Sequence, residues 1–118
     1  MDVSIETLDG VTVIRLNGVL DARSVTGFRD RISALIAAGS VRFVVDAAQL
    51  RFVDSMGLGA LLYLRRFARQ GKGDVRIASA GRELLGLLDL SGLRTIFDVC
   101  PDVPSALARF AGAAPPAG

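Results

Sequence analysis

RFVDSMGLGALL, residues 51–62, joins an apolar segment to a leucine-rich helical pattern through an acid, a serine and two glycines. The leucines recur at the spacing of one helix face, so the pattern predicts a helix that opens near Ser55 or Met56. The Gly-Lys-Gly sequence at 71–73 should break this helix. The polar turn before the helix could hold a nucleophile, cradle a phosphate, or be acted upon by another protein.

The segments on either side of this stretch alternate between strand and helix patterns. Alternating apolar residues and an Asp9-Gly10 turn predict an antiparallel hairpin at the start of the chain. The remaining predicted elements are a helix within 21–38 with Asp21 or Ser24 as N-cap, strands at 41–45 and 75–78, a helix over 82–91, a strand at 95–99, and a helix over 103–110. Asp46 is expected to end the strand at 41–45. This order predicts an α/β fold with a mixed sheet of four to five strands, right-handed crossovers and helices mainly on one face.

The chain has room for one domain. It has 118 residues, of which 51% are hydrophobic and 22% charged, which is typical of a folded domain with one core. We expect this domain over residues 1–111, and a disordered tail of small residues and prolines over 112–118. No apolar run reaches the 18 or so residues that span a bilayer, and the first ten residues do not resemble a secretory signal. A cytoplasmic protein with no membrane span is expected.

The composition argues against several classes of function. Histidine is absent, which removes the commonest general base, the Ser-His-Asp triad and most zinc sites. A single cysteine, Cys100, permits no internal disulfide and no multi-cysteine metal site. The net charge of +2 is spread along the chain, and with one Tyr and no Trp the sequence does not favour nucleic-acid binding. We therefore expect no enzyme, no metal and no nucleic-acid partner.

The glycines of the opening stretch do not complete a known catalytic or nucleotide-binding motif. A nucleophile elbow, G-x-S-x-G, would need glycine at Val53, and a dinucleotide fingerprint, G-x-G-x-x-G, would need glycine at Leu62. The Gly-Lys-Ser/Thr of a P-loop is also missing. We expect no cofactor, and interpret Gly57 and Gly59 as residues that permit a tight turn and close helix packing.

Two interpretations of Ser55 remain open on the residues alone. It could simply be the N-cap of the helix. Alternatively, a hydroxyl in the first helical turn could be presented to the active site of another protein. A phosphate there would face the positive end of the helix dipole, and beside Asp54 it would concentrate negative charge at any interface. In that case the stretch is a binding switch and not a catalytic site.

The sequence resembles the STAS domain family and, within it, the bacterial anti-sigma factor antagonists. The resemblance covers roughly residues 3–110. It lies in Gly-Val-Leu-Asp at 18–21, in VVDAAQLRFVDSMGLGALL at 44–62, and in LLDLSGL at 87–93. The order and spacing of these pieces carry the resemblance.

The resemblance implies a partner-switching mechanism. Such antagonists bind an anti-sigma factor that is itself a serine kinase of the histidine-kinase-like ATPase type, and so free a sigma factor. The kinase phosphorylates the serine after the motif's aspartate, which abolishes binding, and a phosphoserine phosphatase restores it. Ser55 matches the acceptor, Asp54 the preceding acid, and Asp21 an acid near the phosphorylation site. The implied partner-binding residues are Asp21, Asp54, Ser55, Met56, Gly57, Leu58 and Gly59, on a monomer or weak dimer.

The chain departs from the family pattern at two positions. Met56 stands where a second Ser or Thr is usual, and Val19 replaces a common Glu. The resemblance also leaves an alternative function, a STAS scaffold subunit of a larger stress-sensing or transport assembly.

Overall fold

The computed structural model describes the backbone of residues 1–113 and the side chains of residues 1–110. Its elements follow one another as strands and helices along the chain. They are β1 (Asp2–Leu8), β2 (Val11–Leu20), α1 (Val25–Ala37), β3 (Arg42–Val53), α2 (Ser55–Gln70), β4 (Asp74–Ala78), α3 (Arg82–Ser91), the 3₁₀ helix η1 (Leu93–Thr95), β5 (Asp98–Cys100) and α4 (Val103–Ala113).

The five strands form one mixed sheet in the order β1-β2-β3-β4-β5. β1 pairs with β2 antiparallel, whereas the pairs β2–β3, β3–β4 and β4–β5 are parallel. The hairpin turn places Asp9 and Gly10 at positive φ, as its Asp-Gly sequence predicts. The predicted mixed sheet with an opening hairpin is therefore confirmed.

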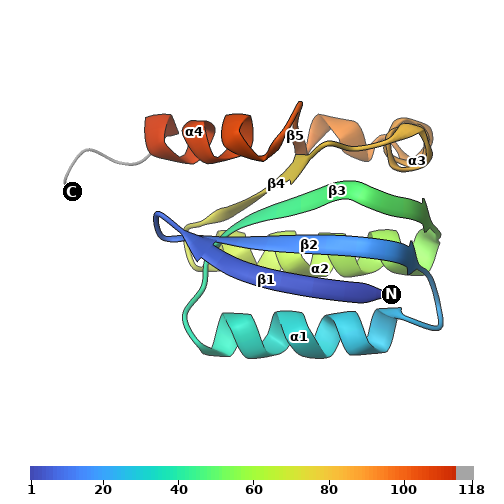
Figure 1. Ribbon diagram of the computed structural model, residues 1–118, viewed down its shortest axis with the longest axis horizontal. Coiled ribbons are helices and arrows are strands. Elements are labelled where there is room, and N and C mark those ends of the chain that lie inside the picture. Colours follow the sequence, from blue (N-terminus) through green and yellow to red (C-terminus); the bar gives the residue numbers. More distant parts are fainter. Residues whose placement is uncertain (114–118) are drawn as a thin grey trace.

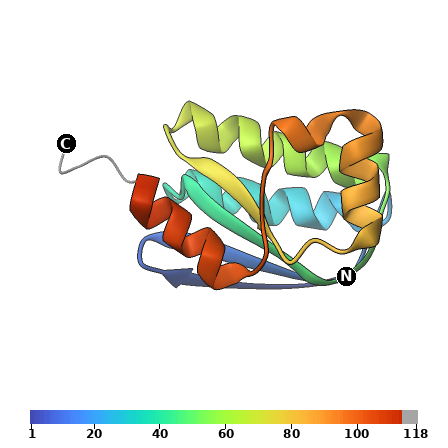
Figure 2. The ribbon, with the colours of Figure 1, turned by 90° about the horizontal axis from the view of Figure 1, so that it is seen from above.

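The helices divide unequally between the two faces of the sheet. α1 and α2 lie side by side against one face, whereas α4 lies on the other (Figures 1 and 2). The larger core joins the first face to α1, α2 and α3, with Phe28, Ile32, Leu61, Leu64 and Leu88 at most 1% exposed. A smaller core, with Val13, Val44, Cys100, Ala106 and Phe110 among its members, lies under α4. Three of the four α-helices thus share one core, as predicted.

The prediction that Asp46 ends the third strand is wrong, because β3 continues to Val53. The pairing of β2 with β3 shifts register between Arg15 and Asn17, opposite this point. The Asp46 carboxylate accepts a hydrogen bond from the Ala48 amide at 3.0 Å and lies 3.4 Å from the Nε atom of Arg15. The acidic side chain therefore lies at a local irregularity within the strand and does not end it.

The C-terminal elements differ from the prediction in their bounds. Thr95 belongs to η1, and the last strand is Asp98–Cys100 instead of residues 95–99. α4 starts at Val103 as predicted, after an Asp102 carboxylate that accepts from the Ser105 amide at 2.8 Å, and it continues to Ala113. The tail predicted to be disordered lies, from residue 114 on, outside the described residues.

Candidate functional site

The opening sequence stretch lies where two parallel strands end together. Leu20 at the end of β2 is paired with Val53 at the end of β3. The Asp54 amide then donates to the Leu20 carbonyl at 3.2 Å, which continues the pairing by one residue. The loop after β2 and the first turn of α2 therefore meet at one edge of the sheet, the carboxyl edge of the parallel strands.

Asp54 is the N-cap of α2. Its backbone is extended, and its Oδ1 atom accepts a hydrogen bond from the Gly57 amide at 2.9 Å. Its Oδ2 atom accepts from the Ala22 amide, in the loop after β2, at 3.3 Å. One carboxylate therefore stabilises the start of α2 and also links it to the neighbouring loop. Ser55 is consequently not the N-cap, and that open interpretation is wrong.

Ser55 is the first residue of α2 and its side chain is exposed. Within residues 1–110, its hydroxyl makes no side-chain hydrogen bond. The first amides of a helix lack intrahelical partners, and they produce a positive potential at this end. The hydroxyl is therefore accessible and lies in a position that favours a negative group.

The Asp21 loop precedes α1 at the same edge. The Asp21 Oδ1 atom accepts from the amides of Arg23 and Ser24, at 3.0 and 3.3 Å. The Ser24 hydroxyl accepts from the Asp21 amide at 3.0 Å and donates to the Val19 carbonyl at 2.8 Å. Ser24 is the N-cap of α1, one of the two predicted alternatives. These contacts give the loop a defined shape beside Asp54.

The residues after Met56 lie beneath the surface to different degrees. Gly57 is packed so closely that a Cβ atom there would lie 2.4 Å from the Leu20 carbonyl oxygen and 2.7 Å from its Cγ atom. Leu58 is 6% exposed and belongs to the main core. A Cβ atom at Gly59 would meet only a guanidinium nitrogen of Arg29, at 3.9 Å. Close helix packing therefore requires glycine at 57 but not at 59.

Sequence reasoning missed an apolar surface next to this turn. Phe52 and Met56 are 44% and 54% exposed, and Leu90 of α3 is 88% exposed. Phe52, Asp54, Gly86, Leu87 and Leu90 line part of an open groove of about 460 Å³ between the end of β3 and α3. A signal was present in the sequence, since α3 carries more leucines than one helix face can bury: Leu84 and Leu88 face the core, and Leu90 does not.

The side chains at this edge of the sheet are polar, charged and apolar groups at the surface. The site presents a hydroxyl, two carboxylates and apolar side chains, and the sequence has no histidine to serve as a base. Among the described residues, no three side chains of His, Cys, Asp or Glu come together in a way that could hold a metal ion. Within residues 1–113, no helix is both long and apolar enough to cross a membrane.

Comparison with known protein families identifies the family of this chain. The family described as the STAS domain matches residues 2–106. The chain belongs to the STAS domain family. This STAS domain is 28% identical over 111 residues to the anti-sigma F factor antagonist of Paenibacillus polymyxa, with 93% of the chain and 95% of the relative covered.

Solved structures have the same fold. An anti-sigma factor antagonist from Mycobacterium paratuberculosis superimposes with a TM-score of 0.83 at 24% identity, with 92% of each chain covered. The Bacillus cell fate determinant SpoIIAA in its phosphorylated form gives a TM-score of 0.74 at 25% identity, with 92% of this chain and 98% of that chain covered. The family match covers residues 2–106, so it includes both the Asp21 loop and the turn at Asp54 and Ser55.

Proposed function

We propose that this STAS domain is an anti-sigma factor antagonist switched by phosphorylation of Ser55. The observation that carries the proposal is the exposed Ser55 hydroxyl in the first turn of α2, next to the Asp54 cap, which is itself hydrogen-bonded to the loop after β2. The relative from Paenibacillus polymyxa is named an anti-sigma F factor antagonist, and SpoIIAA has been solved in a phosphorylated form. Both likenesses support a role as a modifiable binding protein.

The unmodified domain binds an anti-sigma factor through the carboxyl edge of its sheet. Met56, Phe52 and Leu90 provide exposed apolar area around Ser55, while Asp21 and Asp54 provide charge. Apolar side chains with polar groups at the rim are the usual composition of a protein interface. The shape of the turn comes from Gly57, Leu58 and Gly59. Gly57 and Leu58 are buried, so they support the surface from beneath. Binding of the anti-sigma factor frees a sigma factor.

Phosphorylation reverses this binding by adding charge to the docked surface. A phosphoserine carries about 1.5 to 2 negative charges, and it would lie beside the Asp54 carboxylate. The free amides of α2 can accommodate that charge in the unbound domain without unfolding it. In the complex, the same charge must be desolvated against the partner, which weakens the interface. The modification therefore acts on binding and not on the fold.

The proposed partners follow from this cycle. The anti-sigma factor is a serine kinase of the histidine-kinase-like ATPase type, and a phosphoserine phosphatase restores the unmodified domain. The domain itself is a cytoplasmic binding protein, a monomer or weak dimer, and catalyses no reaction.

The test compares the affinity of the purified domain and three variants for a kinase anti-sigma factor of the same organism. Without ATP, Ser55→Ala should bind as tightly as the unmodified domain. With ATP, it should remain bound, because it cannot be phosphorylated. Ser55→Glu and Ser55→Asp should bind at least about tenfold more weakly, which corresponds to about 1.4 kcal/mol. Equal affinity of Ser55→Ala and Ser55→Glu would contradict the proposal. A stable assembly of megadalton size formed by the domain alone would favour a scaffold subunit instead.

A further inference from the structure

A cationic side chain of α1 lies against α2. The guanidinium of Arg29 lies 5.0 Å from the centre of the Tyr63 ring. One of its terminal nitrogens is 3.9 Å from the position of a Cβ atom at Gly59, where glycine provides no side chain. A 3.0 Å hydrogen bond between the hydroxyls of Ser33 and Tyr63 joins the same two helices, which lie side by side (Figures 1 and 2). Arg29 is therefore on the side of α1 that faces α2.

Ser55 lies on the same stripe of α2 as Gly59 and Tyr63. The three positions are four residues apart, so they follow one another along one helix face, with about 5–6 Å between successive Cβ positions. The guanidinium of Arg29 is thus about one helical turn from Ser55. Both helices begin at the carboxyl edge of the parallel strands, and the side chains of a helix point back toward its start. Because Arg29 is exposed, its side chain can turn from Tyr63 toward Ser55.

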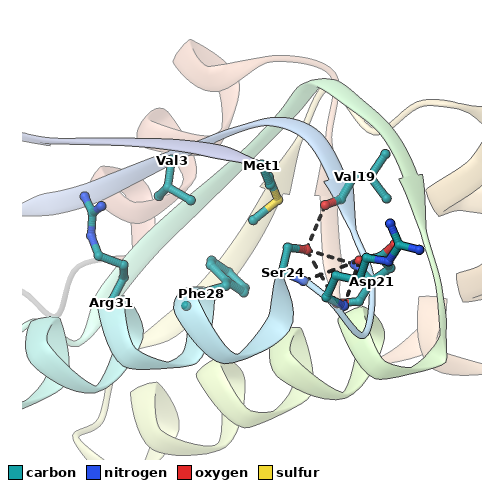
Figure 3. Close-up of a pocket in the computed structure, with 9 residues that line it drawn as sticks. Met1, Val3, Val19, Asp21, Ser24, Phe28 and Arg31 are labelled. Carbon is teal, nitrogen blue, oxygen red and sulfur yellow. Dashed lines mark hydrogen bonds between the residues drawn. The ribbon is translucent and has the colours of Figure 1, made fainter.

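Position, and not the lack of an ion-pair partner, distinguishes Arg29 from other arginines. Several arginines, Arg29 among them, have no carboxylate within ion-pair distance in residues 1–110. Arg23 and Arg31 line the surface between β1 and α1, and Figure 3 shows Arg31 on the side of α1 that faces β1. Arg82 lines the open groove between β3 and α3. Arg29, in contrast, lies on the α2 side, along the stripe that starts at Ser55.

We propose that Arg29 binds the phosphate of phosphorylated Ser55 within the same chain, an inference that rests on the proposed function and adds a regulatory residue to it. A guanidinium and a phosphate form charge-assisted hydrogen bonds, frequently as a bidentate pair. The phosphate adds about 1.5 to 2 negative charges directly beside the Asp54 carboxylate. The cation from α1 offsets that repulsion.

The pair gives the two states of the domain different surfaces. In the unmodified domain, Arg29 lies over Tyr63, and the Ser55 hydroxyl is free to meet a kinase. In the phosphorylated domain, Arg29 leaves Tyr63 and holds the phosphate between α1 and α2. Arg29 therefore stabilises the phosphorylated state, which is the state proposed not to bind the anti-sigma factor.

The test uses the full chain with phosphoserine inserted at position 55 during translation by an expanded genetic code. NMR spectra of the arginine Nε–H groups are compared between this chain and the unmodified one. The Arg29 signal should shift on phosphorylation more than the signals of Arg31 and Arg66, which are exposed elsewhere on α1 and α2. The Tyr63 ring signals should shift with it, because the guanidinium leaves the ring.

A double-mutant cycle measures the pair as a change in stability. Urea denaturation gives the effect of phosphorylation on the unfolding equilibrium constant in the original chain and in Arg29→Gln. Phosphorylation should destabilise Arg29→Gln more than the original chain, by about two- to fivefold in that constant, as expected for an exposed ion pair. Arg29→Lys keeps the charge but not the planar guanidinium, so it should retain only part of this difference.

Matched variants exclude a general effect of positive charge. Arg31→Gln removes an exposed arginine two residues further along the same helix, on the side that faces β1, and should show no such difference. Arg82→Gln removes the arginine of the groove between β3 and α3 and should show none either. An unshifted Arg29 signal would overturn the proposal. So would a coupling of Arg29→Gln no larger than that of Arg31→Gln or Arg82→Gln.

The outcome is separable from that of the proposed function. Neither the spectra nor the cycle uses the kinase or the anti-sigma factor, so a failure here would leave switching by phosphorylation standing. A Ser55 that the kinase does not modify would instead overturn the regulatory role of Arg29, even if the pair forms in the chain made with phosphoserine.

Discussion

The Asp54 carboxylate accepts hydrogen bonds from Ala22 at 3.3 Å and from Gly57 at 2.9 Å, so one side chain joins the loop before α1 to the first turn of α2. Ser55, the next residue, lies at this junction with its hydroxyl exposed. A charge added to Ser55 therefore appears beside the residue that organises both loops. If this edge binds the anti-sigma factor as proposed, a phosphate on Ser55 changes the charge of the binding surface without a change of fold.

The capping and charge roles of Asp54 can be separated by substitution. Asp54→Ala removes both hydrogen bonds and should lower the free energy of unfolding by about 1 kcal/mol. Asp54→Asn retains the acceptor for the Gly57 amide but loses the one for the Ala22 amide, so its loss of stability should be smaller than that of Asp54→Ala. Urea denaturation followed by circular dichroism measures both. Equal losses in the two variants would show that the N-cap hydrogen bond to Gly57 is not responsible, and would leave the charge and the link to Ala22 as the cause.

Gly57 and Gly59 provide a matched pair within one helix turn. Gly57→Ala places a Cβ atom 2.4 Å from the Leu20 carbonyl oxygen, and should destabilise the domain by about 1–3 kcal/mol. Gly59→Ala meets no atom closer than 3.9 Å, and should stabilise it by about 0.5–1 kcal/mol through helix propensity. Thermal and urea unfolding should give opposite signs for the two variants. The same sign for both would rule out the packing explanation.

The exposed leucine of α3 should matter for binding and not for folding. Leu90 is 88% exposed, so Leu90→Ser should change the free energy of unfolding by less than about 0.5 kcal/mol. If the groove beside Asp54 contacts the anti-sigma factor, the same variant should weaken the complex several-fold by surface plasmon resonance. Gln70→Ser, at the exposed C-terminal end of α2, is the control and should bind normally. An unchanged affinity of Leu90→Ser would remove α3 from the interface.

Cys100 should make the stability depend on pH at the alkaline end. Burial, and secondly the Asp98 carboxylate, raise the pKa of this thiol, although Arg109 and Arg76 lower it in part. The unfolded thiol then ionises at a lower pH than the native one. The free energy of unfolding should therefore be unaffected below the ordinary thiol pKa and fall as the pH rises from there through the raised pKa. Urea midpoints between pH 7 and 10 should show this decrease, and Cys100→Ala should lack it.

Local patterns predicted most of the fold because they reflect local physics. The Asp-Gly turn, the helical spacing of the leucines and the glycine at 39, which has a φ of 98°, each specify a conformation within a few residues. The predicted bounds are wrong where contacts with residues distant in sequence determine the secondary structure. β3 passes Asp46 because β2 pairs with it beyond that point, and this pairing is not visible in the segment 41–53 alone. Likewise, Thr95 has strand propensity but lies in a 3₁₀ turn after α3.

The position of the turn before α2 was predictable from the sequence, but its contacts with other elements were not. The sequence predicted that the helix opens near Ser55 or Met56, and α2 begins at Ser55, with Asp54 as its N-cap in place of Ser55. The hydrogen bond from Ala22 joins positions 32 residues apart, and no periodicity encodes it. The apolar groove requires Phe52 from β3 and Leu90 from α3 on one surface, which depends on how α3 packs. The partner-binding role of these residues stays a prediction.

The most direct test of the central claim is to locate phosphate after incubation with a kinase anti-sigma factor of the same organism and ATP. Mass spectrometry of proteolytic peptides should find one phosphate, on Ser55, and Ser55→Ala should remain unmodified under the same conditions. Met56 should not prevent the reaction, because its exposed side chain leaves the hydroxyl accessible. An unmodified Ser55, under conditions in which a known antagonist is fully phosphorylated by its own kinase, would contradict the account.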